Sequence, residues 1–184
     1  MSLGALLLVG CGSSRNQGHA AGSTTISPST TTPTKTSQRP ASAFCRPDPH
    51  QGVHDPQRLK VHKPCATFDG TVVEAPERAP DGDLTFFAAP DRAYKWMLNA
   101  KNSRKGGLHI EIVPRDQPSC KRGQRITAYP VNNLGVCSGA HVEAPPLGAH
   151  VRVIGPYVLD SWDHWNEIHP VWKLEILSLK AGSA

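Results

Sequence analysis

Two short segments of this 184-residue chain each place an imidazole two residues from a carboxylate. His109 and Glu111 alternate with apolar residues in one segment, and Glu167 and His169 do so in the other. Residues two apart in a strand face the same side. Two imidazoles and two carboxylates are competent metal ligands or a general acid–base pair. They are also typical of cross-strand charge pairs on a solvated face, which we favour, so we predict a surface patch with no metal and no cofactor.

Two tryptophans near the carboxyl end are further candidates for ligand contact. Trp162 and Trp165 flank a turn, where they either stack on bases or sugars or plug the end of a small barrel, the interpretation we favour. Three polar residues of the same turn could extend the patch: Asp160, Asp163 and His164.

Catalytic signatures are absent from the sequence. It contains no Gly-rich phosphate loop, no G-x-S-x-G elbow and no H-E-x-x-H helix. His50, His54 and His62 lie in a proline-rich segment that cannot form a helix to align them, so we expect surface residues there. No catalytic residue is assigned, and a non-enzymatic role is favoured.

The amino terminus carries features of an export signal. Residues 1–10 contain an apolar stretch that is typical of a signal peptide and too short to span a bilayer. Leu8-Val9-Gly10-Cys11 resembles a bacterial lipobox, which implies cleavage before Cys11 and its acylation with chains such as palmitate. Between Gly12 and Ala43, 20 of 32 residues are Gly, Ser, Thr or Pro, a composition that cannot offset the entropy of ordering. We therefore predict a lipidated linker over 11–43, an irregular lead-in over 44–59 and a folded domain over 60–180.

The chain has five cysteines, and assigning Cys11 to the lipid leaves an even number. Cys45, Cys65, Cys120 and Cys137 allow three pairings, which the sequence alone does not distinguish. We favour Cys45 with Cys65 and Cys120 with Cys137, because each pair brackets a loop-like stretch bearing Pro or Gly. Since disulfides form in oxidising compartments, we predict an extracytoplasmic location, with the chain held on the bacterial cell membrane by its lipid.

The net charge of +5 does not by itself indicate nucleic-acid binding. Residues 60–184 carry 15 basic and 13 acidic groups, whereas a protein that grips a phosphate backbone needs many cationic contacts on one surface. Nucleic acid is therefore not expected as a partner.

The elements that must position these residues are mainly strands. Period-two alternation over 167–177 predicts a strand with Ile168 and Trp172 on its buried side. A short helix is predicted over 91–105, with Asp91 as its N-cap and Gly106 as its stop. The remaining segments are four strands, over 68–74, 84–88, 107–113 and 149–159, and an irregular stretch over 114–146.

Five short strands with one short helix suit a small closed barrel and resemble the OB-fold, a five-stranded Greek-key barrel that binds oligonucleotides, oligosaccharides or proteins. The chain is also similar to an uncharacterised group of exported bacterial OB-like domains. The matching pieces are Gly70-Thr71-Val72-Val73, Asp81-Gly82-Asp83, Leu98-Asn99, Val151-Arg152-Val153-Ile154-Gly155-Pro156 and Trp165-Asn166-Glu167-Ile168-His169-Pro170-Val171. Thr85 stands where that group would place a histidine. The resemblance implies that the third and fifth strands are neighbours, which would unite the four patch residues.

The sequence thus predicts a lipid-anchored OB-like module outside the cytoplasm that binds an unknown protein or oligomeric ligand. Two alternatives stay open. One is a metal-assisted, nuclease-like hydrolase that uses the His/Glu patch, and the other is a structural protein of the envelope.

Overall fold

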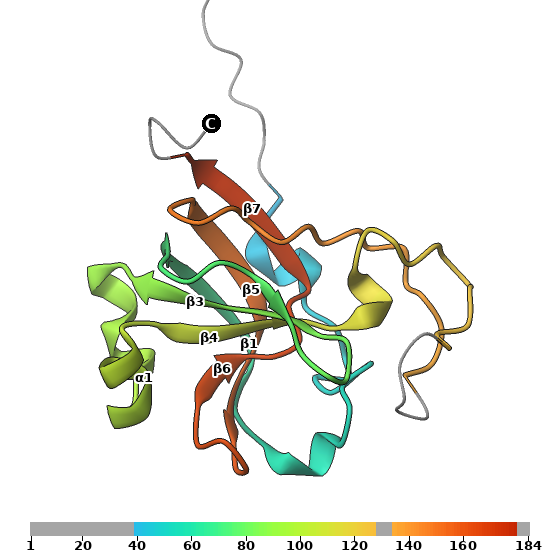
Figure 1. Ribbon diagram of the computed structural model, residues 1–184, viewed down its shortest axis with the longest axis horizontal. Helices are drawn as coiled ribbons and strands as arrows, with labels where there is room; N and C mark the ends of the chain where they lie inside the picture. The colour runs from blue at the N-terminus through green and yellow to red at the C-terminus, as the bar shows by residue number, and fades with distance from the viewer. Residues whose placement is uncertain (1–38, 128–133, 180–184) are drawn as a thin grey trace, which may run out of the picture. The chain divides into compact units, whose positions relative to one another are not determined.

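The computed structural model describes residues 39–127 and 134–179 (Figure 1). The predicted signal peptide, Cys11 and most of the predicted linker lie outside the described residues. In the described part, none of the helices has the length and apolar character needed to cross a membrane. The helices of this described part are short: 3-10 turns at Ala41–Phe44, Pro56–Arg58, Arg92–Met97 and Pro114–Asp116, and one α-helix, α1 (Ala100–Lys105).

In residues 39–127 and 134–179, seven strands form one mixed sheet. They are β1 (Leu59–Val72), β2 (Glu77–Arg78), β3 (Leu84–Pro90), β4 (Leu108–Ile112), β5 (His150–Asp160), β6 (Asn166–Ile168) and β7 (Lys173–Ser178). The pairing order β1-β3-β4-β6-β5 returns to β1, so five of the strands form a ring. β4 and β6 are parallel, whereas the other described pairs are antiparallel. The mainly β prediction is confirmed at this level.

The longest strand, β1, closes the ring because it pairs with both β3 and β5. Register shifts between Val61 and Ala66 mark where it bends against β5. At Gly70 an added Cβ would lie 2.5 Å from the Ala89 carbonyl oxygen of β3. Glycine is therefore required where β1 passes from one neighbour to the other.

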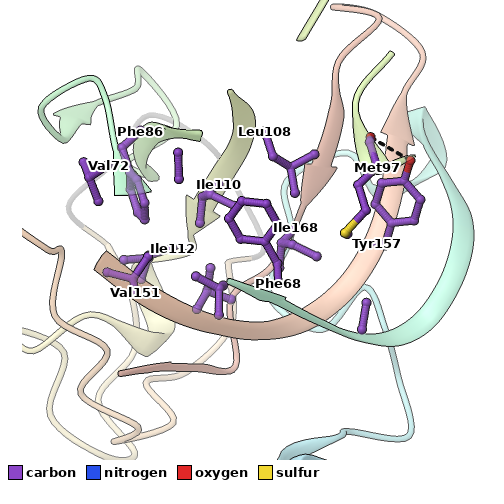
Figure 2. Close-up of a cluster of buried hydrophobic side chains, with 14 of the residues drawn as sticks. Phe68, Val72, Phe86, Met97, Leu108, Ile110, Ile112, Val151, Tyr157 and Ile168 are labelled. Carbon is purple, nitrogen blue, oxygen red and sulfur yellow. Dashed lines mark hydrogen bonds between the residues drawn. The ribbon is translucent and has the colours of Figure 1, made fainter. Parts of the chain in front are cut away.

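The ring strands supply the apolar core. Figure 2 shows the labelled side chains gathered between the strands, with the Tyr157 hydroxyl donating to the Met97 carbonyl oxygen at 2.9 Å. Burying a side chain of the size of Phe68 or Ile110 contributes about 1.5–3 kcal/mol relative to exposure. The fully buried members from the ring strands are Phe68, Val72, Phe86, Ala88, Leu108, Ile110, Ile112, Val151, Val153 and Ile168.

The predicted helix over 91–105 is divided in two. A 3-10 turn ends at Met97, and α1 begins after Asn99, whose side chain accepts hydrogen bonds from the backbone N–H groups of Lys101 and Asn102. Asp91 makes no capping bond, so Asn99 is the true N-cap of the α-helix. Gly106 has a φ of 88° and ends α1, as predicted.

The strand predicted over 167–177 is interrupted. β6 and β7 both pair with β5, but residues 169–172 stand opposite only Gly155 and Pro156. An added Cβ at Gly155 would lie 2.4 Å from the Pro170 carbonyl oxygen, so glycine lets this bulged segment pass. Every residue from 166 to 172 is buried, and the predicted alternation of buried and wet positions is wrong here. Trp172 is buried as predicted.

Both favoured disulfides are present, Cys45–Cys65 and Cys120–Cys137. The first ties the lead-in to β1, and the second closes a loop within the stretch 114–146. The two bonds indicate an oxidising, extracytoplasmic location.

Candidate functional site

The parallel pairing of β4 with β6 brings the predicted patch residues together. His109 lies opposite Glu167 in the register, and Ile110 lies opposite Ile168. His109 Nδ1 is 3.0 Å from Glu167 Oε1 and 3.2 Å from Glu111 Oε1. Because side chains alternate along both strands, these charged groups occupy one face of the pair while the isoleucines enter the core on the other.

His169 forms a second layer behind this group. Its Nδ1 lies 2.8 Å from Glu111 Oε2 and 3.3 Å from Glu167 Oε2. Its Nε2 lies 3.2 Å from Asp83 Oδ2. Each glutamate therefore has one carboxylate oxygen beside His109 and the other beside His169.

The prediction of a solvent-exposed patch is wrong, although the residues do converge. Glu167 and His169 are fully buried, Glu111 is buried, and only 12% of the His109 side chain is exposed. The ring of Phe87 stacks on the imidazole of His109 with 4.6 Å between ring centroids. A face that the local alternation assigned to water is thus covered by side chains from other segments.

Two further charged residues complete the cluster. The Arg58 guanidinium forms an ion pair with Asp160, and its second terminal nitrogen lies 3.9 Å from Glu111 Oε2. Asp160 Oδ1 also accepts the backbone N–H of Trp162 at 2.7 Å. Arg58 was missed by sequence reasoning, because it lies in an irregular lead-in without periodicity.

Asp83 was also missed as a member of the site. A signal was available, since Asp81-Gly82-Asp83 forms a turn directly before β3, and Leu84 pairs with Ile112 at the end of β4. That register places Asp83 near Glu111. The identity of its partner, His169, depends on the bulge after β6, which the sequence pattern did not predict.

Burial and opposite charges shift the protonation of these groups in different directions. Burial raises the pKa of Asp83 to about 7, against the opposing influence of His169. Burial also acts to raise the pKa of Glu111, but the charges and hydrogen bonds of its cationic neighbours, His169 first, lower it overall. Burial acts to lower the pKa of His169 and of His109, yet the surrounding carboxylates raise both, with His169 well above its ordinary value. The centre of the cluster is therefore ionic, whereas Asp83 holds a proton more readily than an ordinary aspartate does.

A hollow of about 430 Å³ lies beside the cluster and reaches Glu111. Its rim carries Trp162, whose side chain is 61% exposed and whose ring centroid is 5.7 Å from the Arg58 guanidinium carbon. The favoured prediction, in which this tryptophan plugs a barrel end, is wrong. Other residues at the hollow include His54, Asp81 and Asp163.

Trp165 lies on the cluster rather than on the hollow. Its ring is 5.1 Å from that of Phe87 and 6.1 Å from that of His109, and Lys101 Nζ lies 4.2 Å from its centroid. The half-buried indole therefore helps to screen His109 from water. His164, predicted as a possible extension of the patch, is exposed.

The three histidines of the proline-rich lead-in do not form a metal-compatible group among the described residues. His62 is exposed, with its ring centroid 5.0 Å from that of Tyr157. His50 and His54 are half-buried.

Among the residues that the structure describes, two sets of three side chains have the composition and spacing of metal ligands. One is Asp83, Glu111 and His169, and the other is His109, Glu111 and Glu167; within each set the ligand atoms lie within 4.8 Å of one another. The same groups can exchange protons among themselves without a metal. The arrangement thus supports ion pairing, proton exchange or metal coordination.

No protein-family model, no curated protein sequence and no solved structure matches this chain.

Proposed function

We propose that this chain is a membrane-anchored, extracytoplasmic binding module built on an OB-like Greek-key barrel. The ring of five strands supports the barrel assignment. The two disulfides support a location outside the cytoplasm. The anchor is the acylated Cys11 of the lipobox-like segment, from which the linker would hold the folded part above the bilayer.

The observation that carries the ligand assignment is the exposed indole of Trp162 at the rim of the hollow. An aromatic face packs against the C–H face of a sugar ring, while neighbouring polar groups bond to the hydroxyl groups at the edge of that ring. Asp81 and Asp163 supply such groups at this hollow. We therefore assign an oligosaccharide as the ligand class, one of the classes that OB-folds bind.

The charges at the hollow disfavour a polyanion. Arg58 is already paired with Asp160, and the other charged groups there include Asp81, Glu111 and Asp163. A phosphate backbone gains affinity by contacts to unpaired cations, so these carboxylates would repel it. A neutral sugar chain meets no such repulsion.

A binding screen with a matched tryptophan control tests this proposal. Trp162 and Trp96 are 61% and 62% exposed, so Trp162→Ala and Trp96→Ala remove similar surface area at different places. In a panel of neutral oligosaccharides and single-stranded oligonucleotides, a sugar should bind the intact protein. Trp162→Ala should weaken that binding at least tenfold, and Trp96→Ala should leave it unchanged.

Three results would count against the assignment. Equal losses in the two variants would indicate nonspecific contact with exposed indoles. Binding of the oligonucleotides alone would overturn the sugar class. Failure of every compound to bind would favour the structural role in the envelope.

A second candidate function, metal-assisted hydrolysis, is favoured by one observation: the hollow reaches Glu111, which belongs to both metal-compatible sets. The test is hydrolysis of model glycosides and phosphodiesters with and without added Zn²⁺ or Mn²⁺. Metal-dependent turnover that is lost in Glu111→Gln, and kept in Glu175→Gln on β7, would support this function. Its absence under all these conditions would reject it.

A further inference from the structure

The charged face of the β4–β6 pair is organised around a position suited to a cation. We propose that His109, Glu111 and Glu167 bind one divalent transition-metal ion of the Zn²⁺ or Mn²⁺ class. The inference depends on neither sugar binding at Trp162 nor hydrolysis, because a metal held here stabilises the fold even if no substrate reaches it.

The spacing of His109 from each of the two carboxylates fits direct coordination, and the ligand atoms of the three residues lie within 4.8 Å of one another. Metal–nitrogen and metal–oxygen bonds of about 2.0–2.2 Å place neighbouring ligand atoms roughly 3.0–3.5 Å apart. His109 Nδ1 stands 3.0 Å from Glu167 Oε1 and 3.2 Å from Glu111 Oε1. A single ion between these atoms therefore requires little movement of the strands.

Hydrogen bonding alone satisfies this arrangement poorly. Two imidazole Nδ1 atoms face four glutamate oxygens, two at His109 and two at His169. An N–H group directs one proton along one line. Each imidazole Nδ1 can therefore donate a well-aligned hydrogen bond to only one of its two neighbouring oxygens. A metal ion at His109 has no such limit, because it accepts several ligands at once.

His169 and Asp83 supply the outer layer that metal sites need. Ligating carboxylates are commonly held by hydrogen bonds from outside the coordination sphere. His169 Nδ1 lies 2.8 Å and 3.3 Å from the second oxygens of Glu111 and Glu167, and Asp83 orients His169 from its other nitrogen. The contacts with His169 therefore hold Glu111 Oε1 and Glu167 Oε1 in their orientation toward His109 in the metal-free protein.

The ligand types select the class of ion, and the hollow gives a route to it. One imidazole with two carboxylates suits Zn²⁺, Mn²⁺ or Fe²⁺, whereas Ca²⁺ and Mg²⁺ prefer oxygen ligands alone. His109 is the most accessible of the three ligands, and Glu111 borders the hollow. An ion can therefore enter from the hollow side without opening the apolar core.

Calorimetric titration of the full chain, stripped with a chelator, tests the proposal with ZnCl₂ and with MnCl₂. We expect saturation near one ion per chain. His109→Ala should reduce the affinity by about 100-fold or more, beyond the 10–100-fold that loss of an outer-layer residue causes. His150→Ala is the matched control, because His150 also pairs with a carboxylate, Asp91, but at the surface, and it should bind as tightly as the unaltered chain.

A measurement on the unaltered chain covers the case in which His109→Ala fails to fold. Nitrogen-15 NMR of the histidine rings during the Zn²⁺ titration should shift Nδ1 of His109 first. Shifts confined to His50, His54 and His62, or to His19, would show adventitious surface binding and overturn the proposal. Lack of any tight binding by either metal would overturn it as well.

Discussion

On one face of the β4–β6 pair, Ile110 and Ile168 are buried among apolar side chains, and on the other, Glu167 and His169 are buried among charges. These four residues are equally buried, but the forces that hold them are different. Apolar packing is non-directional and loses free energy in proportion to the volume removed. The charged face is stable only while each ion keeps its counter-ion, because an unpaired buried charge is costly. Burial alone therefore does not predict how a position responds to substitution.

The largest expected effect is the loss of the central imidazole. His169→Ala removes the group that separates Asp83, Glu111 and Glu167. Uncompensated carboxylates would then face one another in the interior, and we expect a loss of about 3–5 kcal/mol in the free energy of unfolding. Urea denaturation measures it. A loss below that of a surface substitution, such as Glu74→Gln in the exposed pair with Lys105, would contradict the ionic account.

The apolar face gives the next largest effect. Ile110→Ala should cost about 3 kcal/mol through lost burial and a cavity, within the 2–5 kcal/mol range for such changes, and Ile110→Val about 1 kcal/mol. The same denaturation assay compares them. Equal costs for the two variants would mean that this face is not packed as closely as the burial of Ile110 indicates.

Metal binding should raise the free energy of unfolding through the charged face and not through the apolar face. At a Zn²⁺ concentration 100 times its dissociation constant, the unaltered chain should gain about 2.7 kcal/mol in the free energy of unfolding. Ile110→Val should keep this gain, since its ligands are intact, and His109→Ala should lose it. Thermal unfolding with and without Zn²⁺ measures both.

The smallest effect is expected at Asp83. Since burial raises its pKa to about 7, its charged and neutral forms have similar free energies in the folded protein near that pH. In the unfolded chain this carboxyl has its ordinary pKa and is ionised at pH 7, so the raised pKa works against folding at that pH, and Asp83→Asn, which resembles the neutral form, should not lower the free energy of unfolding. Glu111→Gln should lower it, because the pKa of Glu111 is lowered in the folded protein and its ionised form is the stabilising one. A larger loss at Asp83 than at Glu111 would reverse this ranking.

Much of the framework could be predicted from local pattern. The sequence predicted the strands that become β3, β4 and β5, alternation placed His109 and Glu111 on one face, and the resemblance to the OB-fold implied the strand neighbours that bring His109 beside Glu167. Loop-like composition between cysteines identified both disulfides. These features depend on residues close in sequence, or on a register that one apolar face imposes.

The burial of the charged face could not be predicted in this way. Its cover comes from Arg58, Asp83 and Trp165, which belong to turns and irregular segments with no period. The bulge at 169–172 depends on close backbone approach at Gly155, which is a tertiary contact. Local alternation reports which residues share a face but not what covers that face.

Arg58 lies inside the loop that Cys45 and Cys65 close. Its guanidinium pairs with Asp160 and lies near Glu111. The Cys45–Cys65 bond therefore limits how far Arg58 can move from these two carboxylates. Oxidation after secretion thereby favours assembly of the charge network, and a chain still in a reducing cell interior would hold its arginine less firmly. Maturation of the interior is in this way coupled to the compartment the protein reaches.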